Sequence, residues 1–157
     1  MKAPRIYVDT SVIGGCLDPE FEEWSQGLLR DFQAGIFSLF LSVLTDAEIQ
    51  EAPDEVKKIY AEFRKCAVEI LELGPEAVEL ADAYLGHKIL TPKYRDDARH
   101  IALATIAGLD LLVSWNFKHV VHFEKIQKFN EVNLELGYKP ILIYSPREVT
   151  RHGRQGS

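Results

Sequence analysis

The chain has few cysteines and no long apolar run. Only Cys16 and Cys66 are present, far apart and outside any Cys-x-x-Cys motif, so neither a disulfide framework nor a zinc ribbon is indicated. The longest apolar stretch, residues 101–113, is interrupted by Gly108 and Asp110 and is too short to cross a bilayer. The first residues also lack the apolar core of a secretory signal. We therefore expect a cytoplasmic protein without a membrane partner.

Basic residues are not in excess either. Lysine and arginine number 18 against 24 acids, a net charge of -6, which argues against an unspecific electrostatic grip on nucleic acid. The average hides an asymmetry, because residues 67–85 carry five acids and no base, whereas residues 86–128 carry seven bases against four acids. A polyanion is expected to approach the second region. Solvated helix faces are an equally good explanation for each of these charges.

Internal repeats, low-complexity segments and Gly/Ser linkers are also missing. A chain of 157 residues fits one domain, and 46% hydrophobic with 27% charged residues is an ordinary globular balance. We predict one domain over residues 1–150. The polar, Gly-rich residues 151–157 are predicted to form a flexible tail.

Apolar runs of strand length alternate with stretches of helical periodicity. Strands are predicted at residues 5–9, 37–43, 67–71, 111–114 and 141–144. Helices are predicted at residues 20–34, 75–85, 97–107 and 117–136. Between residues 45 and 65 we predict a short helix that ends before Pro53 and a longer helix that follows it to about residue 65. Such alternation implies parallel strands joined by crossover helices. The predicted fold class is therefore α/β, with a central parallel sheet of four or five strands and helices on both faces.

Ligands of such a sheet gather beyond the carboxyl ends of the strands, where the strand order reverses. Asp9 lies at such an end, because it directly follows the run Ile6-Tyr7-Val8. A carboxylate there can face a ligand, or it can cap a following turn of helix. Local sequence leaves both interpretations open.

Asp97 begins a helical run in which it shares a face with Ile101 and Ala104. A carboxylate at the end of a buried apolar stripe is costly unless it is paired or ligates a cation. The alternative role is to complement the helix dipole in the first turn. The neighbouring Asp96 is expected to point to solvent.

Glu48 is the third candidate acid. The spacing Thr45-x-x-Glu48 matches a capping box, in which the glutamate reaches back to the start of its own helix. The spacing alone does not decide between this role and a ligand-binding role.

Four short motifs, taken in order, resemble the PIN-domain family, the metal-dependent ribonuclease fold that includes the VapC-like toxins of toxin-antitoxin systems. Each motif is short and unspecific by itself, and their order and spacing over residues 5–145 make the resemblance. The motifs are Val8-Asp9-Thr10-Ser11-Val12-Ile13, Leu44-Thr45-Asp46-Ala47-Glu48-Ile49, Asp97-Ala98-Arg99-His100-Ile101-Ala102-Leu103-Ala104-Thr105, and Asp110 to Asn116.

The resemblance implies that Asp9, Glu48 and Asp97 are metal ligands and catalytic residues. Asn116 stands where many members carry a fourth aspartate, and it supplies a neutral oxygen in place of a charge. We therefore expect one Mg²⁺ or Mn²⁺ ion, not two, with Asn116 and Ser114 in hydrogen-bonding support. Asp110 is no substitute, because it precedes its strand and lies at the opposite end.

The resemblance also implies an activity and partners. A metal ion held by carboxylates lowers the pKa of a bound water and orients it for in-line attack on a phosphodiester. The implied function is an endoribonuclease that acts on RNA as the toxin of a toxin-antitoxin pair, with an antitoxin protein and a homodimer as further partners. Four side chains are expected to bind the substrate: Thr10, Ser11, Ser114 and Arg99.

Two other functions stay open. A weakened acidic cluster with Asn116 would make the chain a PIN-like module that binds RNA or protein without cutting. A haloacid-dehalogenase-like phosphatase would use Asp9 as a covalent nucleophile, but that class carries a second acid where Ser11 stands.

His119-x-x-His122 has a spacing that two metal ligands on one helix face would show. Without a third ligand the motif is weak evidence for a transition-metal site. Surface histidines beside Phe117 and Phe123 are the alternative.

Overall fold

A five-stranded parallel sheet forms the centre of the computed structural model, which describes residues 2–152. The strand order is β3-β2-β1-β4-β5, and each neighbouring pair is parallel. The strands are β1 (Arg5–Val8), β2 (Ser38–Ser42), β3 (Ala67–Leu71), β4 (Leu111–Val113) and β5 (Leu142–Tyr144). The predicted α/β class with its parallel sheet is confirmed.

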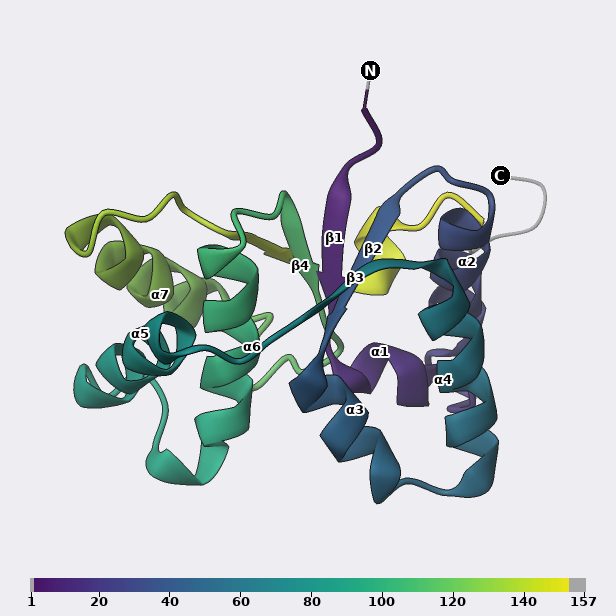
Figure 1. Ribbon diagram of the computed structural model, residues 1–157, viewed down its shortest axis with the longest axis horizontal. Coiled ribbons are helices and arrows are strands. Elements are labelled where there is room, and N and C mark those ends of the chain that lie inside the picture. The colour runs from purple at the N-terminus through teal and green to yellow at the C-terminus, as the bar shows by residue number, and fades with distance from the viewer. Residues whose placement is uncertain (1, 153–157) are drawn as a thin grey trace.

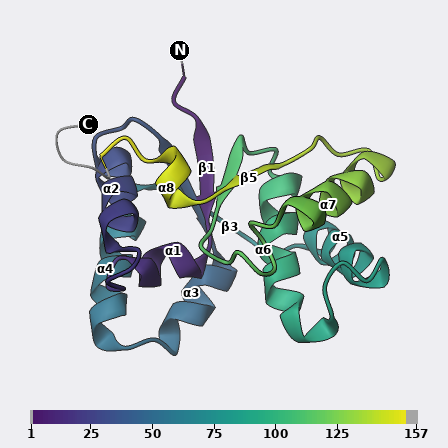
Figure 2. The same ribbon diagram turned by 180° about the vertical axis from the view of Figure 1, so that it is seen from behind.

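Helices cover both faces of the sheet, as predicted. In Figure 1, α5, α6 and α7 lie on one side of the strands, and α1, α2 and α4 lie on the other. Figure 2 shows from behind that α8 lies on the same side as α2. The helices are α1 (Thr10–Gly15), α2 (Glu22–Gln33), α3 (Val43–Gln50), α4 (Asp54–Cys66), α5 (Pro75–Gly86), α6 (Arg95–Ile106), α7 (Phe123–Glu135) and α8 (Pro146–Val149), with a 3-10 turn η1 (Pro92–Tyr94).

The sheet has two hydrophobic cores, one on each face, and alternate strand residues enter alternate cores. Tyr7 packs with the cluster beneath α5, α6 and α7, whereas Ile6 and Val8 pack with the cluster beneath α1, α2 and α4. All three side chains are fully buried. Strands buried on both faces read as continuous apolar runs, which is why the sequence revealed them.

Several elements begin one or more residues away from the predicted start, and for two of them a side-chain contact explains the difference. The helix expected from residue 45 is α3, which starts at Val43 because the Ser42 hydroxyl accepts the Thr45 N–H (3.4 Å) and caps it. The helix expected over 117–136 is α7, which starts only at Phe123. Before it, the Asn116 side chain accepts the backbone N–H of His119 (3.0 Å) and holds a turn.

The C-terminal segment is attached to α2 as far as it is described. Asp31 accepts hydrogen bonds from the Thr150 hydroxyl (2.7 Å), the Arg151 N–H (2.9 Å) and the His152 ring. The rest of the predicted tail, residues 153–157, lies outside the described residues. Within residues 2–152, each helix is too short or too polar to cross a membrane.

Candidate active site

The predicted acids lie at the carboxyl edge of the sheet, where the strand order reverses. The chain runs from β1 through β2 to β3 on one side and continues with β4 on the other side of β1. Asp9 follows β1 and Ser114 follows β4, so these two residues flank the reversal. In Figure 1, α1, α3 and the amino end of α6 lie near the lower ends of the central strands.

Asp9 is held by two hydroxyl groups. It is 4% exposed and occupies the position before α1, but its carboxylate accepts no capping hydrogen bond. One oxygen, Oδ1, accepts from Ser11 Oγ (2.5 Å), and the other accepts from Ser114 Oγ (2.6 Å). Burial raises the pKa of Asp9, and the charge of His100 and the two hydroxyls oppose that rise. Helix capping therefore does not explain why the Asp9 carboxylate is buried against these two hydroxyls.

Glu48 is bound through one of its two oxygens. Its Oε1 accepts from Thr10 Oγ1 (2.7 Å) and from His100 Nε2 (2.6 Å), so the predicted capping box with Thr45 is not formed. Burial acts to raise the pKa of Glu48, but the hydrogen bond and the charge of His100 outweigh it and the pKa is lowered. Glu48 is accordingly the acid of the cluster whose pKa the fold lowers.

His100 was not predicted as a site residue. It is 2% exposed, and its Nδ1 lies 2.6 Å from the Tyr7 hydroxyl, which in turn lies 2.8 Å from Ser42 Oγ. Nε2 faces a carboxylate, so it carries a proton and donates to Glu48. Burial lowers the pKa of His100, but Glu48, Asp9 and Asp97 together raise it above its ordinary value. One sequence signal was available, because residues three apart share a helix face and His100 lies three residues after Asp97.

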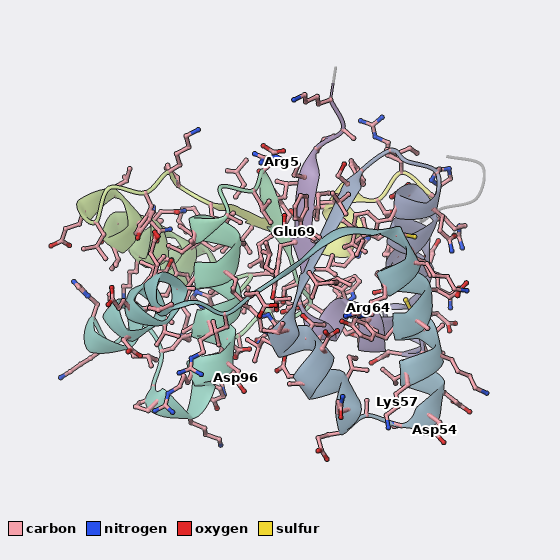
Figure 3. All side chains as sticks on the ribbon, viewed as in Figure 1. Arg5, Asp54, Lys57, Arg64, Glu69 and Asp96 are labelled. Carbon is pink, nitrogen blue, oxygen red and sulfur yellow. The ribbon has the colours of Figure 1, made fainter. Side chains whose placement is uncertain are left out.

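Asp97 lies close enough to Asp9 and Glu48 for their charges to change its pKa. Its Oδ2 accepts from Asn116 Nδ2 (3.3 Å). Burial, and then the negative charges of Asp9 and Glu48, raise the pKa of Asp97 to about 6. Asp96, labelled in Figure 3 near the lower end of α6, is exposed, as predicted.

The predicted substrate-binding residues divide into two groups. Thr10, Ser11 and Ser114 all contact an acid of the cluster, and Ser11 also accepts the Trp115 N–H (2.9 Å). Arg99 makes no hydrogen bond or ion pair with the acids in the part of the chain that the structure describes, and its Nε is buried without a partner. Its role in substrate binding stays a prediction.

The donor chemistry of the cluster fits a hard cation. Carboxylate oxygens are the ligands that Mg²⁺ and Mn²⁺ prefer, and the mutual repulsion that raises the pKa of Asp97 is relieved by a bound cation. The side chains are not arranged as a finished site. Among residues 2–152, no three His, Cys, Asp or Glu side chains are placed to hold a metal ion. The ligand roles of Asp9, Glu48 and Asp97 stay predictions.

Two hollows elsewhere on the surface do not include the three acids. A cavity of about 490 Å³ is lined by Arg5, Phe40 and Glu69, among others, and one of about 520 Å³ lies between α3 and α4 beside Lys57 and Arg64 (Figure 3). The Arg64 guanidinium that borders the second cavity is engaged by both oxygens of a carboxylate on α3.

Comparison with known proteins gives a match in structure only. No protein-family model matches the chain, and no curated protein matches it. Among solved structures, a chain of VapBC2 from Rickettsia felis, crystallised bound to a DNA fragment from their promoter, is similar with a TM-score of 0.59. The two chains are 12% identical, and the match covers 90% of this chain and 98% of that chain. The chain therefore has a PIN-like α/β fold.

Proposed function

We propose that the chain is a Mg²⁺- or Mn²⁺-dependent endoribonuclease that acts as the toxin of a toxin-antitoxin pair. The observation that carries this proposal is the meeting of Asp9, Glu48 and Asp97 from three elements at the reversal of strand order. Burial, and then the negative charges of Asp9 and Glu48, raise the pKa of Asp97 to about 6. A strongly perturbed carboxyl at such a place is typical of a functional site.

Each acid has a defined task in the proposed reaction. Asp9 and Asp97 would hold one ion, which when bound supplies Lewis-acid and water-activating chemistry. Glu48, kept ionised by His100, would be a further ligand or would accept the proton of the attacking water. The hydroxyls of Ser11 and Ser114 orient Asp9 through both of its oxygens.

RNA, an antitoxin and a second copy of the chain are the proposed partners. One structural neighbour is a chain of VapBC2, which supports the proposed toxin-antitoxin role. A basic antitoxin segment would complement the acidic cluster. Cys16 and Cys66 are free thiols, which fits the proposed cytoplasmic location.

One observation favours a second function, that of a PIN-like module that binds RNA or protein without cutting. Asn116 supplies an amide to Asp97 where a fourth acid would add charge, and Glu48 is already paired with His100. Both contacts reduce the negative charge available to a cation. The phosphatase alternative has less support, because Ser11 donates to Asp9 and offers no second carboxyl.

Cleavage of a labelled RNA in Mg²⁺ or Mn²⁺ tests the nuclease proposal. Asp9→Asn and Asp97→Asn are each expected to reduce the cleavage rate by on the order of 100-fold, because each loses a charge that stabilises the transition state through the ion. Chelation with EDTA should have the same effect. Asp96→Asn, an exposed neighbour, is the matched control and should cut like the original chain. Undiminished cleavage by both site variants would refute the proposal.

A further inference from the structure

The loop between β4 and α7 lies beside the acids and carries an exposed aromatic side chain. Asn116 in this loop contacts Asp97, and the next residue, Phe117, is 50% exposed. The Phe117 ring rests edge-on against Trp115, with ring centroids 6.1 Å apart. Trp115 is itself buried and stacked on Phe21. An aromatic ring is therefore presented to solvent from a fixed support, one residue from the acidic cluster.

Three lysines from separate segments gather beside the same loop. The His119 ring packs on the Tyr94 ring with centroids 3.7 Å apart, which joins η1 to the loop. Lys93 reaches to 5.7 Å from the Tyr94 ring centroid. Lys118 directly precedes His119, and the Lys125 N–H donates to His122 Nδ1 (3.4 Å) at the start of α7. After burial, the charges of Lys125, Lys118 and Lys93 lower the pKa of His119. We call Lys93, Phe117, Lys118 and Lys125 the loop strip.

Clustered lysines are unusual on a chain whose net charge is -6. Like charges repel, so such a group favours the approach of a ligand that carries several negative charges. Lysines neutralise the phosphates of a nucleic-acid strand, and exposed aromatic rings stack on its bases. The strip offers both kinds of contact directly beside the carboxylates.

From this arrangement we propose that the loop strip binds an unpaired stretch of RNA, with phosphates on Lys93, Lys118 and Lys125 and a base stacked on Phe117. The strand would then pass the acidic cluster next to Asn116. A duplex cannot use the Phe117 contact, because its bases are already paired and stacked. This inference deepens the proposed ribonuclease function and rests on it for the choice of RNA.

Binding can be measured without cleavage. Fluorescence anisotropy in EDTA, with a short labelled RNA offered single-stranded or annealed to its complement, reports affinity of the whole chain for each form. The double variant Lys118→Glu with Lys125→Glu is expected to weaken single-strand binding by on the order of tenfold or more. The matched control, Lys57→Glu with Lys58→Glu on α4, changes charge equally and should bind like the original chain.

Phe117 decides whether the bound RNA is unpaired. Phe117→Ala is expected to weaken single-strand binding by on the order of tenfold and to leave duplex binding unchanged, whereas Phe117→Trp keeps a stacking surface and retains affinity. Val68→Ala, an exposed apolar residue on the far edge strand β3, is the control.

Three results would overturn the inference: normal single-strand binding by the Lys118/Lys125 variant, equal loss in the Lys57/Lys58 control, or equal effects of Phe117→Ala on both RNA forms. The outcome is separable from that of the nuclease proposal. If the strip variants bind normally but the original chain cuts RNA, only the strip is wrong. If the strip binds RNA as described but no metal supports cleavage, only the nuclease is wrong.

Discussion

The three acids of the site differ in how readily they ionise, and the difference comes from their neighbours. Glu48 is stabilised as a carboxylate by His100, whereas Asp97 has a neutral amide for a partner and two negative charges nearby. Burial also raises the pKa of Asp9, so the fold favours the protonated form of both aspartates and the ionised form of Glu48. A bound cation would favour the ionised form of each acid.

The raised pKa of Asp97 predicts a pH dependence of stability in the metal-free chain. The folded value of about 6 lies above the ordinary value, so the stabilisation by the proton is complete at low pH and is lost as the pH rises through about 6. Asp97→Asn removes the repulsion. Because Asp97 is partly exposed, we expect the Asp97→Asn substitution to stabilise the chain by only roughly 1 kcal/mol at about pH 8.

Urea unfolding in EDTA at about pH 4 and about pH 8 checks this prediction, since the gain should be present only at the higher pH. Asp96→Asn, at the exposed neighbouring position, should show a much smaller gain, because the charge of Asp96 raises the pKa of Asp97 least. A loss of stability in Asp97→Asn at the higher pH would show that Asp97 is not under repulsion.

The chain of contacts from Tyr7 through His100 to Glu48 predicts that Tyr7 acts at a distance. Tyr7→Phe keeps the ring but removes the hydroxyl at His100 Nδ1, so the imidazole and Glu48 are less firmly held. We expect the cleavage rate to fall by on the order of tenfold. The dependence of the cleavage rate on pH should shift as well, because the His100 imidazole loses its partner at Nδ1.

Tyr84→Phe is the matched control for Tyr7→Phe. Tyr84 is also fully buried, and its hydroxyl donates to Asn133 Oδ1 (2.5 Å) on α7. Its loss should affect stability without moving the pH profile of cleavage. Equal profiles for both variants would mean that Tyr7 has only a packing role.

At the scale of elements, α8 is fixed by one buried carboxylate of α2. Asp31 is 0% exposed and is the shared acceptor for Thr150, Arg151 and His152. Asp31→Ala leaves these donors unsatisfied. We expect a loss of about 2 kcal/mol in the free energy of unfolding, measured by urea denaturation. Asp82→Ala, an exposed acid on α5, should be near neutral, and an equal loss there would contradict the account.

Element positions followed from the sequence where the pattern is local. The central strands β1, β2 and β4 are largely buried, and their apolar runs marked them. The partly exposed edge strands β3 and β5 were marked by shorter apolar runs. The predicted start of α3 was wrong. The Thr45-x-x-Glu48 spacing matches a capping box, but the Ser42 hydroxyl caps the helix. Glu48 instead accepts hydrogen bonds from Thr10 and His100, which are distant in the sequence. The turn before α7 was not predicted, because it depends on one hydrogen bond from the His119 N–H to the Asn116 side chain.

At the scale of the whole molecule, the sequence predicted which acids to examine but not how they are held. Asp9, Glu48 and Asp97 meet because parallel strands end at one edge of the sheet, and the alternating pattern predicts that topology. The pairing of His100 with Glu48 spans 52 positions, and that of Ser114 with Asp9 spans 105. Such pairs depend on strand register, which a single sequence does not reveal.

The proposed ribonuclease requires that the folded chain bind a divalent cation at Asp9, Glu48 and Asp97. Calorimetric titration of Mn²⁺ into the metal-free chain measures this binding, with Asp97→Asn and the exposed Asp96→Asn titrated alongside. We expect saturable binding of one ion per chain, unchanged in Asp96→Asn and weakened by on the order of tenfold or more in Asp97→Asn. Absence of saturable binding, or equal affinity in all three proteins, would show that these acids do not form a metal site.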